Sequence, residues 1–322
     1  MRRYLPIVLA SVVVLLGAVW VVSEKKSVPK QEPQQKQVAP LCPFGDSFQK
    51  EVSKSPLPHF LHTLKLPQPF LIDLSQKEHR GLALYYGKGL RHLLHPKVWE
   101  RYGHFSTYVL DKEGNLYLTP MPFISIEPQT FAWQKAIYRL ESQTGKLKPW
   151  RILEEVEASA SNPYGVTSIA YDKHDHTLWV GTLNGSTYTE QKGVIYHIDI
   201  ASKRILGRIE GVDALSLQLL QGKQQRWLLI GSARGGELLA YGLECQEGVN
   251  TPQKLFSLPN TQMQIRKMRV IAPNTLLLET IPFSYTLITQ SAKEDRVRYI
   301  AKWYPQRQKW EISLQMNENV TK

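Results

Sequence analysis

Short runs of apolar and β-branched residues, separated by turns, recur along most of this chain. The clearest example is the stretch 162–209, in which GVTSIAYD, TLWVGT, VIYHIDI and RILGRI follow one another. Each run is bounded by Gly, Asn, Asp or Ser, which is typical of antiparallel strands joined by short connections. The pattern therefore predicts four consecutive strands of one sheet.

The four-strand unit repeats at intervals of about 50 residues, which indicates a repeat architecture. One strand motif recurs as GNLYLTP, HTLWVGT, QRWLLIGS and NTLLLET, with Leu116, Leu178, Trp227 and Leu276 at matching positions. A second motif recurs as LALYYG, AIYRLE, VIYHID and LLAYGLE. Such a unit cannot bury its faces alone, so neighbouring units must stack.

Radial stacking of four-stranded sheets produces a β-propeller, so we predict an all-β fold with four-stranded blades. Four units are regular, and a fifth, His59–His95, is less so, with HFLHTLKL, FLIDL, GLALYYG and LRHLLHP as its runs. Five blades are predicted, with six or seven as alternatives and a β-sandwich or two-domain β protein as the competing architecture. The propeller is expected to span residues 41–316, followed by a flexible tail at 317–322.

A long apolar segment precedes the repeats. Residues 5–22, LPIVLASVVVLLGAVWVV, carry no charge and are just long enough to cross a bilayer as a helix. The bulky end of this segment favours an uncleaved signal anchor at residues 1–23 over a cleaved signal peptide. Residues 24–40 are rich in Pro, Gln and Lys and predict a disordered tether. We expect a membrane-anchored protein whose propeller lies on the extracytoplasmic side, periplasmic or extracellular.

Charge and cysteine content narrow the classes of partner. The chain has 322 residues, a formal net charge of +12 and two cysteines, Cys42 and Cys245. Residues 1–40 hold six Lys and Arg against two Glu, and the remaining charge forms no dense basic run. This disfavours a nucleic-acid groove and favours, at most, weak attraction to an anionic lipid, glycan or polymer. A Cys42–Cys245 disulfide is expected outside the cytoplasm, with two unrelated thiols as the alternative.

The element NPYGVTSIAYDKHDHTLWVGT resembles the repeat of six-bladed propellers of the NHL and SMP-30/gluconolactonase type, and YVLDKEGNLYLTP fits the same template. The resemblance covers two repeats. In SMP-30-type lactonases a Glu, two Asn and an Asp hold a metal at the propeller centre. Asn162 stands near the corresponding Asn–Gly element, but Thr182 or Leu183 occupies the place of the Asp. The resemblance implies the propeller fold and, as an alternative function, a lactonase-type hydrolase.

Sequence motifs of catalysis do not occur. The chain has no Gly-x-Ser-x-Gly elbow, no His-Glu-x-x-His and no phosphate loop. The glycine-rich stretch 231–236 and the turn 174–176 are interpreted as connections between strands. We therefore predict no catalytic residue, metal or cofactor, and a binding or scaffold module. The alternatives are the hydrolase and a subunit of a larger envelope complex.

Loop lengths predict where a partner binds. In an up-and-down blade the connections alternate between two ends, and the long ones here are Thr119–Lys135, Leu183–Lys192, Ile281–Asp295 and Glu154–Thr167. Long loops in a compact domain are usually functional, so we expect one face to bind a protein or an anionic polymer. The candidate binding residues are Phe123, Phe131, Trp133, Tyr164, Tyr188 and Arg234. Alternatively, the aromatic side chains fold back and plug the central opening.

Overall fold

The chain divides into two units, Met1–Val38 and Ala39–Lys322. The computed structural model describes residues 44–45, 47–49, 55–75, 78–122, 131–223, 225–245, 251–286 and 296–315. The predicted signal anchor and tether therefore lie outside the described residues. Within the part that is described, no helix is both long enough and apolar enough to cross a membrane.

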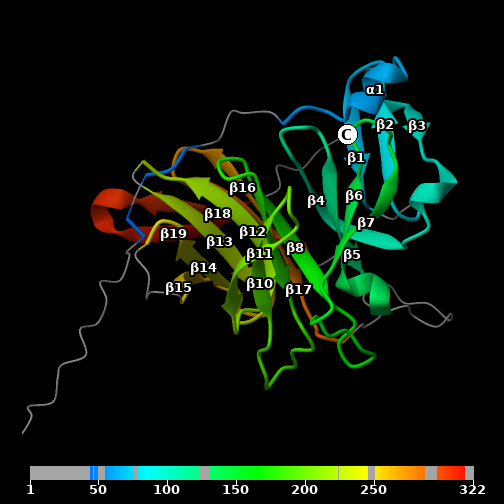
Figure 1. Ribbon diagram of the computed structural model, residues 1–322. Coiled ribbons are helices and arrows are strands. Elements are labelled where there is room, and N and C mark those ends of the chain that lie inside the picture. The colour runs from blue at the N-terminus through cyan, green and yellow to red at the C-terminus, as the bar shows by residue number, and fades with distance from the viewer. Residues whose placement is uncertain are drawn as a thin grey trace, which may run out of the picture. The chain divides into compact units, whose positions relative to one another are not determined.

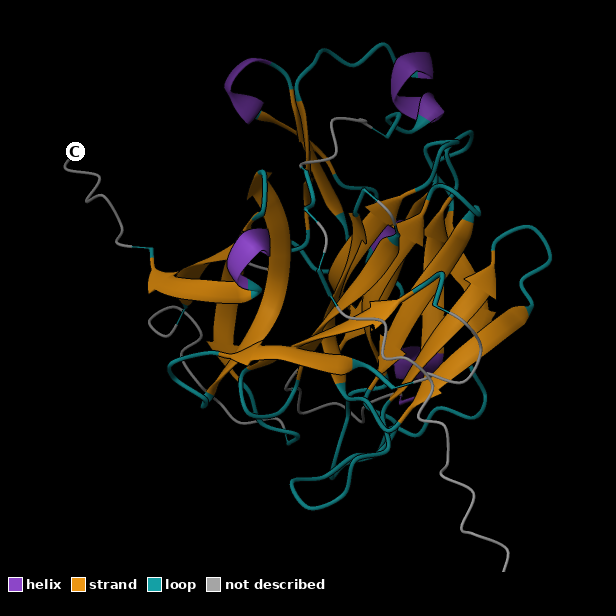
Figure 2. Ribbon diagram, turned by 90° about the vertical axis from the view of Figure 1, so that its left-hand side faces the viewer, coloured by secondary structure: helices purple, strands orange, loops and turns teal. Residues whose placement is uncertain are grey.

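Five antiparallel sheets follow one another along the chain and form a five-bladed, all-β propeller (Figures 1 and 2). The first sheet holds β1 (Phe70–Asp73), β2 (Ala83–Tyr86) and β3 (His92–Leu94). The second holds β4 (His104–Leu110), β5 (Leu116–Met121), β6 (Ala136–Leu140) and β7 (Leu147–Ile152). The third holds β8 (Val166–Asp172), β9 (Thr177–Thr182), β10 (Val194–Asp199) and β11 (Ile205–Glu210).

The fourth sheet holds β12 (Ala214–Gln221), β13 (Arg226–Ser232), β14 (Glu237–Gly242) and β15 (Gln253–Ser257). The fifth holds β16 (Met263–Ala272), β17 (Thr275–Pro282), β18 (Val297–Tyr304) and β19 (Lys309–Leu314). The described helices are short: α1 (His59–Thr63), η1 (Lys88–Leu90), η2 (Lys97–Trp99), η3 (Phe131–Lys135) and η4 (Pro305–Arg307). The first strands β4, β8, β12 and β16 pack against one another in that order. The predicted fold class and number of blades are confirmed.

The first sheet departs from the four-strand pattern. The run HFLHTLKL was expected to be a strand, but His59–Thr63 forms helix α1, and the sheet has three strands. Ser142 lies in the β6–β7 turn and accepts two hydrogen bonds from α1. The Phe60 amide donates to the Ser142 carbonyl (2.8 Å), and the His59 amide donates to the Ser142 hydroxyl (3.0 Å). These bonds satisfy amides that a helix leaves open at its N-terminus. Phe60 and Leu61 are buried against the second sheet, so packing and capping together outweigh the strand-like pattern.

The residues that mark the repeat are buried at equivalent places. Leu116, Leu178, Trp227 and Leu276 begin or nearly begin the second strands β5, β9, β13 and β17, and none is more than 1% exposed. They lie in the hydrophobic clusters that join neighbouring sheets. Burying a side chain of this size stabilises the fold by roughly 1.5–3 kcal/mol. The predicted repeat is therefore the core between blades. No hydrophobic cluster of the described residues joins the first sheet to the fifth.

Glycine in the VGT and IGS motifs lets adjacent blades approach closely. Gly181 on β9 lies so near Ser168 and Ala214 that a Cβ atom at this position would overlap both. Gly231 on β13 has the same relation to β16 of the next blade. Any side chain at these positions would push neighbouring blades apart, which explains why the motif contains glycine there.

The segment before the first blade packs on the fourth and fifth blades. Phe48 forms an isolated bridge with Gly222, donates its amide hydrogen bond to Asn274 Oδ1 (2.8 Å) and accepts one from the Asn274 amide (2.9 Å). Phe44 is buried in an aromatic cluster of the same blades. The rings around it are those of Trp227, Trp303 and Trp310, with centroids at 5.1, 5.3 and 5.7 Å. The start of the domain is thus held against its last two blades.

Cys245 lies just after β14, and the structure assigns it to a disulfide. Cys42, the other cysteine of the chain, lies outside the described residues. The Cys42–Cys245 pairing therefore stays a prediction. Phe44, two residues after Cys42 in the sequence, packs on the fourth blade, which also holds β14 just before Cys245, and this favours the pairing.

Candidate functional site

The described parts of the long connections lie at one end of the propeller, the lower end in Figure 1. The Tyr188 hydroxyl in the β9–β10 loop donates a hydrogen bond to Ser284 Oγ in the β17–β18 loop, at 2.7 Å. Tyr164 in the β7–β8 connection packs on Phe283 of that same loop, with ring centroids 5.2 Å apart. We call the described surface of residues 131–135, 153–165, 183–193 and 283–286 the loop face.

Asp213, in the connection between β11 and β12, organises the loop face from beneath. Its carboxylate is buried and accepts hydrogen bonds from Ser186 Oγ (2.5 Å), the Gly193 amide (2.9 Å), Arg234 Nε (3.0 Å) and the Tyr285 hydroxyl (2.6 Å). The four donors come from three different loops. Because a single carboxylate accepts all four of these hydrogen bonds, Asp213 ties the three loops together.

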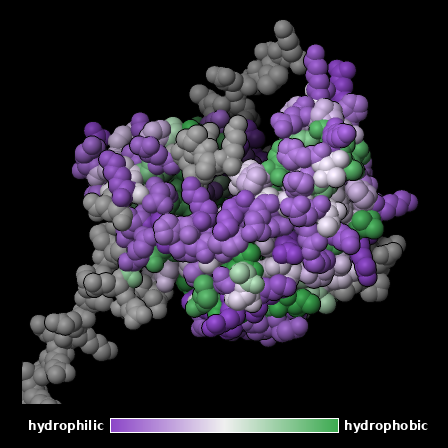
Figure 3. Space-filling view, turned by 45° about the horizontal axis from the view of Figure 1, so that its top comes forward, coloured by the Kyte–Doolittle hydropathy of each residue, from purple (hydrophilic) through white to green (hydrophobic). Residues whose placement is uncertain are grey.

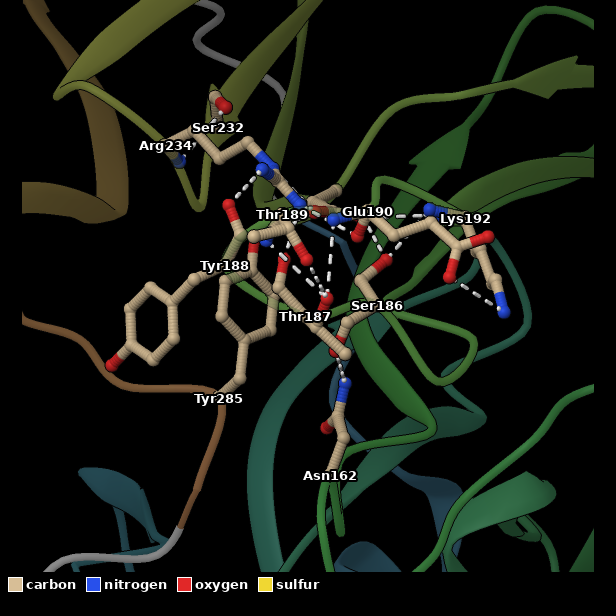
Figure 4. Close-up of polar contacts among 12 residues, drawn as sticks. Asn162, Ser186, Thr187, Tyr188, Thr189, Glu190, Lys192, Ser232, Arg234 and Tyr285 are labelled. Carbon is tan, nitrogen blue, oxygen red and sulfur yellow. Dashed lines mark hydrogen bonds and ion pairs between the residues drawn. The ribbon is translucent and has the colours of Figure 1, made fainter.

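Arg234, in the short β13–β14 loop, extends this network to the β9–β10 loop (Figure 4). Besides Asp213, its guanidinium donates to the carbonyls of Tyr188 (3.0 Å), Thr187 (2.5 Å) and Glu190 (2.7 Å). It also lies 5.3 Å from the centre of the Tyr285 ring, within the range of a cation–π contact. Arg234 was predicted as a binding residue, and the structure shows that its donors fix the conformation of the loop that carries Tyr188.

Tyr188 is the exposed aromatic residue of this network. Its side chain is 66% exposed, yet its hydroxyl is bonded to Ser284 and its ring meets Tyr285 edge-on at a centroid distance of 5.3 Å. In Figure 4 the Tyr188 ring points away from the cluster of loop carbonyls. The Tyr285 hydroxyl itself is buried, and burial beside Asp213 raises its pKa well above the usual value. Tyr188 is therefore a large side chain in a fixed position, presented to solvent.

Tyr164 turns inward. It lies in a hydrophobic cluster whose buried members are Leu183, Leu215, Ala233 and Tyr285, with Phe283 packed alongside. Burial raises the pKa of the Tyr164 hydroxyl. Tyr164 therefore packs against residues of the neighbouring loops. Gly165 after it packs on the backbone of Gln134, and a Cβ atom there would overlap the Gln134 carbonyl, so helix η3 and the β7–β8 connection touch.

The other predicted aromatic residues lie on or near η3. Phe123 is outside the described residues. Phe131 and Trp133 are both half-buried, and the Trp133 carbonyl accepts a hydrogen bond from the Tyr138 hydroxyl at 2.9 Å. These two side chains therefore keep part of their surface available on the loop face.

A second charged cluster lies at the opposite end, where the β8–β9 turn meets β13. Arg226 pairs with Asp172 (2.8 Å), Asp175 (3.1 Å) and Glu244 (2.5 Å). The hydrogen bond from His174 lowers the pKa of the Asp175 carboxyl below its usual value. Across the described ranges, no group of three or more His, Cys, Asp or Glu is positioned to hold a metal ion. At the position where the lactonase pattern has Asp, the Thr182 hydroxyl donates to the Val194 carbonyl (2.9 Å).

Sequence reasoning missed the residues beneath the loop face. Asp213 lies in a short blade-to-blade connection, and Phe283 and Tyr285 lie in the long β17–β18 loop. A signal existed in the FSY tripeptide at 283–285, because two aromatic residues in a long polar loop need a packing partner. The pairing of Asp213 with Arg234 has no comparable signal, since the two residues belong to different connections.

This chain resembles known proteins in structure but matches none of them in sequence. No protein-family profile matches the chain, and no curated protein matches its sequence. The β-propeller domain of Myceliophteria thermophila Cps50 (Swd1) is similar, with 10% identity, a TM-score of 0.43, and coverage of 74% of this chain and 66% of that one. A complex of S. cerevisiae dbp5 with nup159 and gle1 also matches, with 13% identity, a TM-score of 0.38, and coverage of 85% and 68%. A eukaryotic initiation factor matches with 11% identity, a TM-score of 0.37, and coverage of 77% and 56%. A functional conclusion for this chain has to come from the loop face itself.

Proposed function

We propose that this protein is a membrane-anchored, extracytoplasmic propeller whose loop face binds a partner without catalysis. The observation that carries the proposal is Tyr188, a 66%-exposed aromatic side chain whose loop is fixed by Arg234. Interaction surfaces are enriched in Tyr and Trp because these side chains bury a large area at a small entropic cost. A loop that is already ordered loses less conformational freedom when it binds.

A protein partner fits the loop face better than an anionic polymer does. The face includes the exposed Glu154, Glu155 and Glu157, and acidic side chains repel a polyanion. Lys192 and Glu190 at its edge form an ion pair at 3.0 Å, so the rim carries both signs of charge. A mixed polar rim around aromatic side chains is the usual composition of a protein interface. The same surface suits a subunit of a larger envelope complex.

Site-specific photo-crosslinking tests this proposal. A photo-reactive aromatic amino acid replaces Tyr188 in cells, and the matched control carries it at Leu314, which is 62% exposed on the outer strand β19. We expect a discrete crosslinked protein from position 188 that is absent from position 314. A polyanion partner would instead give no crosslinked protein band, together with binding that weakens steeply with salt. Equal crosslinking from both positions, or none from either with no salt-sensitive binding, contradicts the proposal.

A further inference from the structure

A cavity of about 350 Å³ lies between the fourth and fifth blades. One wall comes from β15, the last strand of the fourth sheet, and the other comes from β18, β19 and the turn that joins them. Figure 1 shows these strands at the left of the propeller. Ligand pockets typically enclose about 300–1,000 Å³, so this cavity has the volume of a site for a small molecule. None of its described lining residues belongs to the loop face.

Four aromatic side chains line this cavity, those of Phe44, Phe256, Trp303 and Trp310. Trp303 and Trp310 are opposite each other on β18 and β19, and their ring centroids are 5.3 Å apart. The rings of Phe256 and Phe44 lie 5.4 Å and 5.7 Å from that of Trp310. Because the four rings pack on one another, the aromatic lining is already ordered before a ligand binds, which lowers the entropic cost of binding.

The charged side chains among the described lining residues are both basic, Lys254 and Lys309. Lys254 Nζ already forms an ion pair with Glu237 Oε1 at 2.6 Å. Lys309 begins β19 and is exposed. Gln308, just before it, has a left-handed backbone with φ 49°, and its side-chain amide donates to the Pro305 carbonyl at 2.8 Å. The turn thus fixes the backbone that carries Lys309 at the same cavity as the aromatic rings.

An aromatic lining together with a cation favours a ligand of complementary chemistry. We propose that the cavity binds a small aromatic carboxylate, with its ring against Phe256 and Trp310 and its carboxylate bonded to the Lys309 ammonium. Aromatic rings attract one another in edge-on or offset contacts, and an ammonium forms a strong hydrogen bond with a carboxylate. The volume lies at the lower end of the range for ligand pockets and suits a single ring with a short acidic arm. This site goes beyond the proposed function, because it lies apart from the loop face and needs no protein partner.

Calorimetric titration of the full chain in detergent with three matched probes tests the site, with detergent alone as the blank. Phenylacetate has both a ring and a carboxylate, acetate has only the carboxylate, and benzyl alcohol has only the ring. We expect phenylacetate to bind saturably, with one molecule per chain. It should bind at least about tenfold more tightly than either of the other probes, since a hydrogen bond to a charged group contributes a factor of this size.

Variants separate the two parts of the site. K309Q removes the cation and should abolish the preference for phenylacetate over benzyl alcohol, whereas K309E should reverse it, so that benzylamine binds better than phenylacetate. F256L removes a ring contact and should weaken phenylacetate and benzyl alcohol by a similar factor. The control K302Q removes an exposed lysine of β18 that is not part of the lining, and it should bind every probe as the wild type does.

The titration of the wild type decides the proposal even if a variant fails to fold. Absence of saturable phenylacetate binding overturns it. Acetate or benzyl alcohol binding as tightly as phenylacetate also overturns it, because the site would then not require both groups. Among the folded variants, a K309Q that keeps the preference for phenylacetate, or a K302Q that loses it to the same extent, would show that Lys309 does not bind the carboxylate.

Discussion

Replacing Arg234 by Gln should loosen the loop face while leaving the propeller folded. The change removes the ion pair to Asp213 and the hydrogen bonds to the carbonyls of Thr187, Tyr188 and Glu190. A glutamine is too short to restore all of these contacts at once. The β9–β10 loop would then lose the bonds that fix Tyr188 in its exposed position.

The size of the effect follows from what remains around Asp213. Breaking a buried ion pair by removing one partner typically costs about 3–5 kcal/mol. Asp213 keeps its donors from Ser186, Gly193 and Tyr285, and the Arg234 side chain is 26% exposed, so we expect a smaller cost of about 2–3 kcal/mol. At roughly 2 °C per kcal/mol for a domain of this size, the melting temperature should fall by about 4–6 °C.

Two measurements check this prediction. Differential scanning calorimetry gives the melting temperature, and limited trypsin digestion reports opening of the loop through cleavage after Lys192. The control R208Q removes the exposed Arg208–Glu155 pair, which should change stability by at most about 1 kcal/mol. If R234Q melts like R208Q and Lys192 is cut no faster than in the wild type, then Arg234 does not hold the loop.

Three further predictions concern other parts of the chain. Burial lowers the pKa of His197 below its usual 6.5. The stability that the neutral His197 ring contributes is therefore complete above about pH 6.5 and is lost as the pH falls through the lowered pKa. The melting temperature of H197Q should accordingly fall less between pH 7 and 5 than that of the wild type or of the control H174Q. Non-reducing peptide mapping should recover a Cys42–Cys245 peptide, and two free thiols in the map would contradict this. The bond would close a loop of 203 residues, so its reduction should destabilise the protein by up to about 4–5 kcal/mol. Because residues 5–22 are uncharged, alkaline carbonate should leave the full chain in the membrane pellet, and its release into the supernatant would refute the predicted anchor.

The fold could be predicted because the repeat carries it. The positions Leu116, Leu178, Trp227 and Leu276 recur in sequence because each fills the same space between blades. The first blade was predicted less well, because residues 59–63 have a pattern that suits either a strand or a helix. The choice depends on capping by Ser142, which follows in the next blade and which local pattern does not reveal.

The candidate site could be predicted in outline only. Alternation of connections brings Tyr164 and Tyr188 to one end, and this required nothing beyond loop lengths. Their different orientations, Tyr188 outward and Tyr164 inward, depend on Asp213 and Phe283, which come from other connections of the propeller. Figure 3 shows a mainly hydrophilic surface on which the hydrophobic groups form separate patches. No single hydrophobic patch dominates that view, so surface hydropathy does not mark a binding face there.

The central claim is that the loop face is a recognition surface. It is tested most directly by measuring how tightly the crosslinked partner binds variants of the propeller. The variant combining Y188A with F131A and W133A removes three aromatic side chains of the face, whereas L314A removes an exposed apolar side chain elsewhere. We predict that the triple variant binds the partner at least about tenfold more weakly, with a melting temperature within a few degrees of the wild type, and that L314A binds normally. Wild-type affinity in the folded triple variant would contradict the claim.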